Sequence, residues 1–196
     1  YCSSVSGNWA FVARVPTHAK ESGAHVAYIP GGRELKQREA LVPLLRSIDV
    51  LIVNREEAAF ITGVPFEDER EIFRKWDELT PGRNVNVMTD ARNGVSVSDG
   101  RFLYKAGIFE DTGVKDRTGA GDAFGSGFVA GLMRQLGGAA VSDVTTDAVE
   151  YAIRLGSANA TAKVEGIGAK FGLLTAREFD ADPRWKSFDI HKTLLA

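Results

Sequence analysis

The sequence has little of what marks disulfide-stabilised, metal-binding or membrane proteins. It contains one cysteine, Cys2, and three histidines that lie far apart, His18, His25 and His191. One cysteine excludes an internal disulfide framework, and scattered histidines lack the spacing of a zinc site. No apolar run approaches the roughly 20 residues of a membrane span, and the first residues do not resemble a signal peptide. We therefore expect a cytoplasmic protein that does not associate with membranes.

An excess of charge of one sign is also missing. The chain has 24 Lys and Arg against 26 Asp and Glu, a formal net charge of -2. This balance provides no basic surface of the kind that binds nucleic acid, so we expect no nucleic-acid partner. The 196 residues are 44% hydrophobic and 26% charged, which is typical of a globular chain with one core. We expect a single domain over residues 1–196.

What the chain does contain is an alternation of short apolar runs with segments of helical period. This pattern indicates an α/β fold with a largely parallel sheet. The expected strands are residues 2–5, 26–29, 50–53 and 85–89, and the expected helices are residues 9–22, 34–47, 67–79, 122–135 and 146–163. Asp99-Gly100 lies between two further apolar runs, residues 94–98 and 102–105, and predicts an antiparallel hairpin at the sheet edge.

Gly119-Ala120-Gly121 directly precedes an expected buried helix. A small-residue turn that opens a helix presents free backbone N–H groups at the positive end of the helix dipole, which is suited to binding phosphate. Asp122 at the same helix start could accept the proton of a hydroxyl that attacks a phosphoryl group. The alternative is that Asp122 only caps the helix and that the glycines permit close helix packing. Neither a P-loop nor a G-x-G-x-x-G motif is present.

Residues 116–128, Asp-Arg-Thr-Gly-Ala-Gly-Asp-Ala-Phe-Gly-Ser-Gly-Phe, closely resemble the D-T-x-G-A-G-D signature of the ribokinase (PfkB-type) carbohydrate kinase family. The resemblance implies that Asp122 is the catalytic base and that the amides of Gly119, Ala120 and Gly121 form an anion hole. It implies a ribokinase-like three-layer αβα sandwich with a mostly parallel central sheet and an edge β-hairpin. It also implies an enzyme that uses ATP and Mg²⁺ to phosphorylate a hydroxyl of a sugar or related small molecule.

Two further segments resemble motifs of the same family. Asn54-Arg-Glu-Glu57 is similar to its N-x-x-E motif, which implies a phosphate contact for Asn54 and a Mg²⁺ contact for Glu57; a simple helix-capping pattern is the alternative. Thr89 and Ala91 lie in a stretch similar to V-T-x-G-x-x-G, which follows the nucleotide phosphates. Ala91 replaces a glycine there, at a cost of roughly 1 kcal/mol if the backbone must take a positive φ.

The C-terminal part resembles the family's adenine-binding and cation-binding segment. The resemblance implies that Ser157 or Asn159 reaches the base, and that Asp116 with the loop of residues 168–172 binds a monovalent cation. Gly172 stands where a serine is common, which leaves a K⁺ dependence open.

The resemblance covers the chain but corresponds only to the later portion of a family member. The family's N-terminal substrate motif, its aspartate that binds sugar hydroxyls and its β-sheet lid have no counterpart in this sequence. The acceptor, a sugar or a nucleoside, therefore stays open, and we expect the isolated chain to bind ATP weakly with little or no phosphotransferase activity. A parallel sheet that lacks its first strands would expose an apolar edge, which implies either a longer natural protein or self-association, such as a homodimer.

Three other functions compete with a carbohydrate kinase. An adenosine-type nucleoside kinase would use the same machinery. A non-catalytic module that senses nucleotides or sugar phosphates is favoured by the departures at Ala91, Arg117 and Gly172, but the joint presence of Asn54, Glu57 and Asp122 argues against it. An oxidoreductase-type dinucleotide domain ranks far behind, because no glycine fingerprint follows the first strand.

Overall fold

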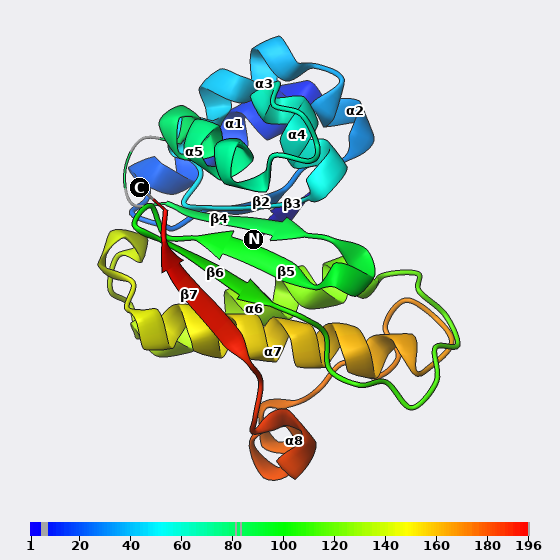
Figure 1. Cartoon of the computed structure of the whole chain (residues 1–196). Coiled ribbons are helices and arrows are strands. Elements are labelled where there is room, and N and C mark those ends of the chain that lie inside the picture. The colour runs from blue at the N-terminus through cyan, green and yellow to red at the C-terminus, as the bar shows by residue number, and fades with distance from the viewer. Residues whose placement is uncertain (5–7, 81, 83, 196) are drawn as a thin grey trace.

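The protein is a three-layer sandwich around one seven-stranded sheet, seen in a computed structural model that describes residues 1–4, 8–80, 82 and 84–195 (Figure 1). The strands lie in the sheet in the order in which they occur in the chain: β1 (Cys2–Ser3), β2 (Ala27–Ile29), β3 (Val50–Asn54), β4 (Val85–Thr89), β5 (Val95–Ser98), β6 (Phe102–Ala106) and β7 (Ile190–Leu194). The pairs from β1 to β4 are parallel, and those from β4 to β7 are antiparallel. The expected α/β sandwich is confirmed.

The helices cover both faces of the sheet (Figure 1). One face carries α1 (Trp9–Glu21), α2 (Gly32–Leu35), α3 (Arg38–Leu44), α4 (Arg55–Thr62) and α5 (Glu69–Leu79). The other carries α6 (Ala120–Leu136) and α7 (Thr146–Val164), and the short α8 (Ala176–Ala181) packs beyond them. A buried apolar cluster fills each interface with the sheet, centred on Trp76 on one side and on Phe128 on the other. The sheet is therefore buried on both faces, as the near-continuous apolar runs of β3 and β4 require.

The expected hairpin forms, but it does not end the sheet. Strand β7 pairs antiparallel with β6, with Tyr104 opposite Lys192, and is itself the edge strand. We expected no strand so near the C-terminus. Its pattern of half-buried and exposed residues has no clear alternation, because β7 faces solvent along most of its length.

The helix expected over residues 34–47 is divided. It breaks at Gln37, whose backbone (φ -99°, ψ 46°) leaves the helical region. The cause is tertiary. The fully buried carboxylate of Glu34 accepts hydrogen bonds from Ser4 Oγ and Gly31 N, while Arg38 Nε donates to Ile61 O, so the two halves are anchored to different elements.

The other expected elements form within two residues of their predicted ends, and only the first strand is described in part. The strand expected over residues 2–5 is observed as Cys2–Ser3, and Val5 lies outside the described residues. In the part of the chain that the structure describes, no helix is long and apolar enough to span a bilayer.

Candidate nucleotide and phosphoryl-transfer site

Two candidate residues meet at the carboxyl ends of the central parallel strands. Asn54 is the last residue of β3 and Thr89 the last of β4, and they are register partners. In open α/β sheets, ligands bind in the crevice outside these strand ends. The sheet thus places Asn54 and Thr89 side by side where a ligand is expected.

Asn54 and Glu57 form a reciprocal cap on helix α4. The Asn54 side chain accepts a hydrogen bond from Glu57 N at 2.8 Å, and Glu57 Oε2 accepts one from Asn54 N at 2.9 Å. Burial raises the pKa of the Glu57 carboxyl above its usual range, partly offset by the bond from the Asn54 amide. The capping alternative therefore describes this pair as it stands. The other carboxylate oxygen of Glu57 takes no part in the cap and has the chemistry to coordinate a cation.

Helix α6 starts at the glycine motif. Gly119 is the N-cap in a left-handed conformation (φ 82°), and a Cβ there would lie 3.0 Å from Ala169 O. The Ala120 amide donates to Arg117 O at 3.1 Å, which closes the turn. Within the described chain, the N–H groups of Gly121 and Asp122 have no acceptor, and Asp122 is exposed in the first helical turn. Free donors and a carboxylate thus lie together at the positive end of α6.

A cavity of about 360 Å³ lies between this helix start and the loops after β4 and β6. Five candidate residues line it: Thr89, Ala91, Ala120, Gly121 and Ser157. Its other walls are mostly apolar, with Ile108, Phe109, Val114, Phe124 and Val164 among them. The volume falls within the range of small-molecule sites, and an apolar slot ending at a helix N-terminus suits an adenine nucleotide.

Other candidates lie outside the cavity wall. Asn54, Glu57, Asp116, Gly119, Asp122 and Asn159 do not line it. Asn159 is buried inside α7, where its Oδ1 accepts a hydrogen bond from Leu174 N at 2.8 Å and its amide donates to Ala123 O at 3.4 Å. Of the two residues expected to reach the base, Ser157 therefore has access to the cavity, while Asn159 joins α6 to the loop before α8.

Ala91 has the backbone conformation that its glycine-like position suggested. Its φ is 46°, and among the described residues it alone combines a positive φ with a side chain. An L-residue in this region costs roughly 1 kcal/mol or more relative to glycine. Ala91 keeps this strained turn at the cavity wall.

We expect Ala91→Gly to relieve that strain and raise the free energy of unfolding by up to about 1 kcal/mol, measured by urea denaturation. Ala140→Gly is the matched control, because Ala140 has φ -66° and should lose about 0.4–1 kcal/mol through the greater freedom of the unfolded chain. Equal losses at both positions would contradict the assignment of strain to Ala91.

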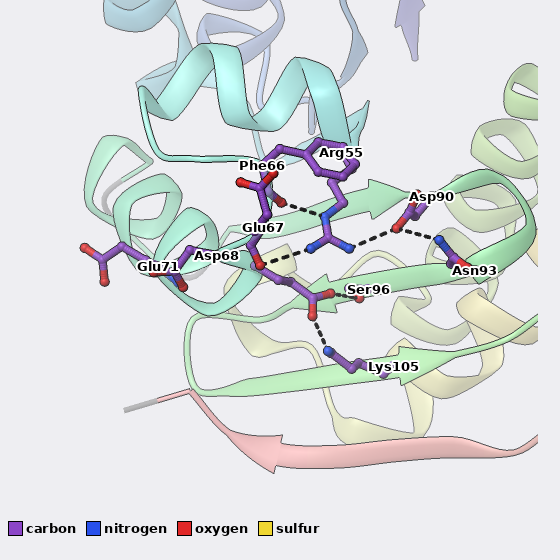
Figure 2. A network of polar contacts seen from close by, with 10 residues as sticks. Arg55, Phe66, Glu67, Asp68, Glu71, Asp90, Asn93, Ser96 and Lys105 are labelled. Atoms are coloured by element: carbon purple, nitrogen blue, oxygen red, sulfur yellow. Dashed lines mark hydrogen bonds and ion pairs between the residues drawn. The ribbon is translucent and has the colours of Figure 1, made fainter.

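A network of polar contacts around Arg55, which the sequence analysis missed, holds the turn that contains Ala91. Figure 2 shows Arg55 extending from the start of α4, where it donates to Asp90 Oδ2 at 3.0 Å and to Phe66 O at 3.0 Å. Asp90 Oδ2 also accepts a hydrogen bond from Asn93 at 3.2 Å. Arg55 thus ties the N-x-x-E helix to the turn after β4. Its position inside the Asn54–Glu57 motif was the available signal.

Three more residues near the site were not foreseen. Arg92 and Arg117 line the cavity and bring positive charge to it. Tyr1 lies close to the start of α6: burial, and next the nearby Asp122 carboxylate, raise the pKa of its phenol to about 12. The sequence analysis noted Arg117 only as a departure from the family motif, and Arg92, which lies in the stretch that contains Thr89 and Ala91, was not noted. Nothing in the sequence links Tyr1 to Asp122.

Asp116 is held by the backbone on both sides. Its Oδ1 accepts Thr118 N at 2.9 Å and its Oδ2 accepts Gly168 N at 3.0 Å. These amides are the main reason that the pKa of the Asp116 carboxyl is lowered to about 2. Lys163 Nζ donates to Asp116 O at 2.7 Å and lies 3.7 Å from Asp116 Oδ2. The carboxylate is therefore ionised at neutral pH, and the Lys163 ammonium lies close to it as a counter-charge.

No preformed metal cage accompanies these residues. In the described ranges there is no group of three or more His, Cys, Asp or Glu side chains that could hold a metal ion. Mg²⁺ in nucleotide sites commonly uses one or two carboxylates together with substrate phosphates. Glu57, half-buried near the strand ends, has the donor chemistry for that role.

Comparison with known proteins agrees on one family. Residues 6–176 match the model of the pfkB family carbohydrate kinases. A cytidine kinase from Thermococcus kodakarensis is 33% identical over 102 residues, which are 51% of this chain and 35% of that protein. A ribokinase from Haemophilus influenzae is 29% identical over 163 residues, 82% of this chain and 47% of the relative. The chain thus spans about half or less of these relatives.

Solved structures share the fold. A carbohydrate kinase from Agrobacterium tumefaciens superposes with a TM-score of 0.67 at 22% identity, covering 94% of this chain and 53% of that one. A nucleoside kinase from Burkholderia thailandensis, in complex with inosine, has a TM-score of 0.70 at 20% identity over 91% of this chain and 53% of its own. At these identities the likeness establishes a ribokinase-like fold and nothing finer.

Proposed function

This chain belongs to the pfkB family of carbohydrate kinases, and we propose that it supplies the ATP-binding and phosphoryl-transfer part of a kinase acting on a hydroxyl of a sugar or related small molecule. The observation that carries the proposal is the start of helix α6. There, free backbone N–H groups at the end of the cavity lie beside the exposed carboxylate of Asp122.

The proposed roles follow from chemistry at that helix start. The apolar part of the cavity takes the adenine, with Ser157 as a polar contact, and Thr89, Ala91, Arg92 and Arg117 lie along the phosphates. The amides of Gly119, Ala120 and Gly121 stabilise charge on the transferring phosphoryl group, although the Ala120 amide must then release Arg117 O. Asp122 takes the proton of the acceptor hydroxyl.

Mg²⁺ fits the residues near the strand ends. Glu57 would hold it through water or directly, and Asn54 would donate an amide N–H to a phosphate oxygen while its Oδ1 caps α4. A bound Mg²⁺ would neutralise phosphate charge. Burial disfavours the charge of the Glu57 carboxyl and raises its pKa, and a cation bound to it would offset that effect.

The acceptor side of the reaction requires groups beyond these. Strand β1 is an edge strand with β2 as its neighbour in the described chain. A longer polypeptide or a second copy of the chain would cover that edge and supply acceptor contacts. Sugars and nucleosides are both candidate acceptors, since the relatives include a ribokinase and a cytidine kinase.

The test is ADP release against a panel of sugars and nucleosides with Mg²⁺. We expect the 196-residue chain to bind ATP in calorimetry but to release little ADP, and the longest natural form of the protein to turn over with one acceptor class. Robust acceptor-dependent ADP release by the 196 residues alone would contradict the proposal that acceptor contacts come from a longer polypeptide or a second copy. Silence of the longest form across the panel, with ATP still bound, would favour the sensing module.

A further inference from the structure

Lysine 163 carries a charge into the interior of the protein. It lies in the last turn of α7, and its side chain is 0% exposed, although the helix end is otherwise partly open to solvent. A buried ammonium group is costly unless it is paired and hydrogen-bonded. Both partners of this one belong to Asp116: the backbone oxygen at 2.7 Å and the carboxylate Oδ2 at 3.7 Å.

Asp116 joins three segments around that ammonium. Its amide donates to Val164 O at 3.3 Å at the end of α7, its Oδ2 binds the amide of Gly168, and its Oδ1 binds the amide of Thr118. The last contact shapes the turn of residues 116–119, which leads into the start of α6. Whatever cation sits beside Asp116 therefore helps to fix the approach to that helix start.

A monovalent cation such as K⁺ does not fit beside Asp116 in this structure. Two of the oxygens expected to bind it already have partners: Lys163 Nζ donates to the backbone oxygen, and Gly168 N donates to Oδ2, which also lies 3.7 Å from the Lys163 ammonium. A K⁺ ion bonded to the same backbone oxygen would lie a few ångströms from the ammonium, where like charges repel strongly and little water screens them. The site expected for a free cation is filled by a side chain.

We propose that Lys163 is a built-in cation that takes the place of K⁺ beside Asp116, so that this protein needs no monovalent cation to order the turn leading into α6. The inference rests on the proposed function only in treating that turn as part of the phosphoryl-transfer site. A tethered ammonium has a fixed, high effective concentration at its site. Its occupancy does not vary with the salt around the protein.

The test compares unfolding temperatures of the 196-residue chain in KCl, NH₄Cl and tetramethylammonium chloride at equal ionic strength. An ion that binds the folded state raises the unfolding temperature in a saturable way. We expect K⁺ and NH₄⁺ to give the wild-type chain no advantage over tetramethylammonium, which is too large for the site. A saturable stabilisation of the wild type by K⁺ would overturn the inference.

The Lys163→Met variant removes the charge and keeps the length of the side chain. We expect it to be less stable than the wild type and to regain stability saturably with K⁺ or NH₄⁺, while tetramethylammonium has no effect. Lys115→Met is the matched control, because Lys115 is exposed one residue before Asp116, and it should show no such response. A folded Lys163→Met chain that ignores both ions would overturn the inference. If that variant stays unfolded in every salt, the wild-type comparison decides.

This test separates the inference from the proposed function. Unfolding temperature requires neither an acceptor nor turnover, so a failed kinase assay leaves the result intact. Conversely, a K⁺ response of the wild type would remove the inference about Lys163 while leaving Asp122 and the α6 helix start as they are.

Discussion

Replacing Asp122 by Asn should lower kcat by at least ~10² while leaving the affinity for ATP nearly unchanged. Asparagine has almost the shape of aspartate, so the exposed first turn of α6 should fold as before. What it loses is the ability to accept a proton. The measurement is steady-state ADP release by the longest natural form of the protein with its acceptor, together with calorimetric titration of ATP.

A second aspartate provides the control for general effects of charge at a helix start. Asp147 is exposed in the first turn of α7, as Asp122 is in α6. Asp147→Asn removes the same charge from the first turn of another helix, away from the cavity, and should leave kcat within about twofold of wild type. If kcat of Asp122→Asn equals that of Asp147→Asn, Asp122 is not the catalytic base.

Replacing Gly94 by Ala should produce the largest loss of stability in this set, about 3 kcal/mol or more. Gly94 has φ 91°, and a Cβ on it would lie 2.1 Å from Ala106 O and 2.5 Å from Gly107 O. Both obstacles are backbone atoms at the end of β6, which cannot rotate away. Because Gly94 also lines the cavity, ATP affinity should fall with stability.

Gly100→Ala isolates the steric part of that loss. Gly100 also has a positive φ, 82°, but its nearest atom to an added Cβ is Gly82 O at 4.0 Å. It should therefore lose only the backbone term, roughly 1–2 kcal/mol. Urea denaturation of the two variants gives the difference in their free energies of unfolding. A Gly94→Ala variant no less stable than the Gly100→Ala variant would contradict the expected clash, because it would show that the backbone at Ala106 and Gly107 can move away without cost.

The local part of this fold was predictable because each signal lies within a few residues. Apolar runs gave β3 and β4, Asp99-Gly100 gave the hairpin, and the glycine motif gave the start of α6. The Asn54–Glu57 pair has the reciprocal contacts that a capping pattern predicts. Ala91 was singled out because it replaces a glycine of the family motif that it resembles, and its φ of 46° is in the region that favours glycine.

The features that were missed depend on contacts between distant segments. The burial of Lys163 follows from Asp116, 47 positions earlier, which arrives at the end of α7 only when the sandwich is assembled. Arg55 and Asp90 are likewise 35 positions apart. The break at Gln37 has the same origin, since periodicity describes one helix while Glu34 and Arg38 are fastened to different neighbours. The sequence pattern of a segment indicates its secondary structure, but it does not indicate which distant residues the segment will contact in the folded protein.

The place of β7 at the sheet edge also bears on how the molecule is made. Strand β6 pairs with residues 190–194, some ninety positions later in the chain. On a ribosome that adds residues one at a time, the far side of the hairpin therefore stays open through the synthesis of both α6 and α7. An unpaired strand edge is a template for wrong pairing with other chains. Strand β7 thus covers the β6 edge only after α6 and α7 have been made, and until then that edge of the hairpin is open to wrong pairing.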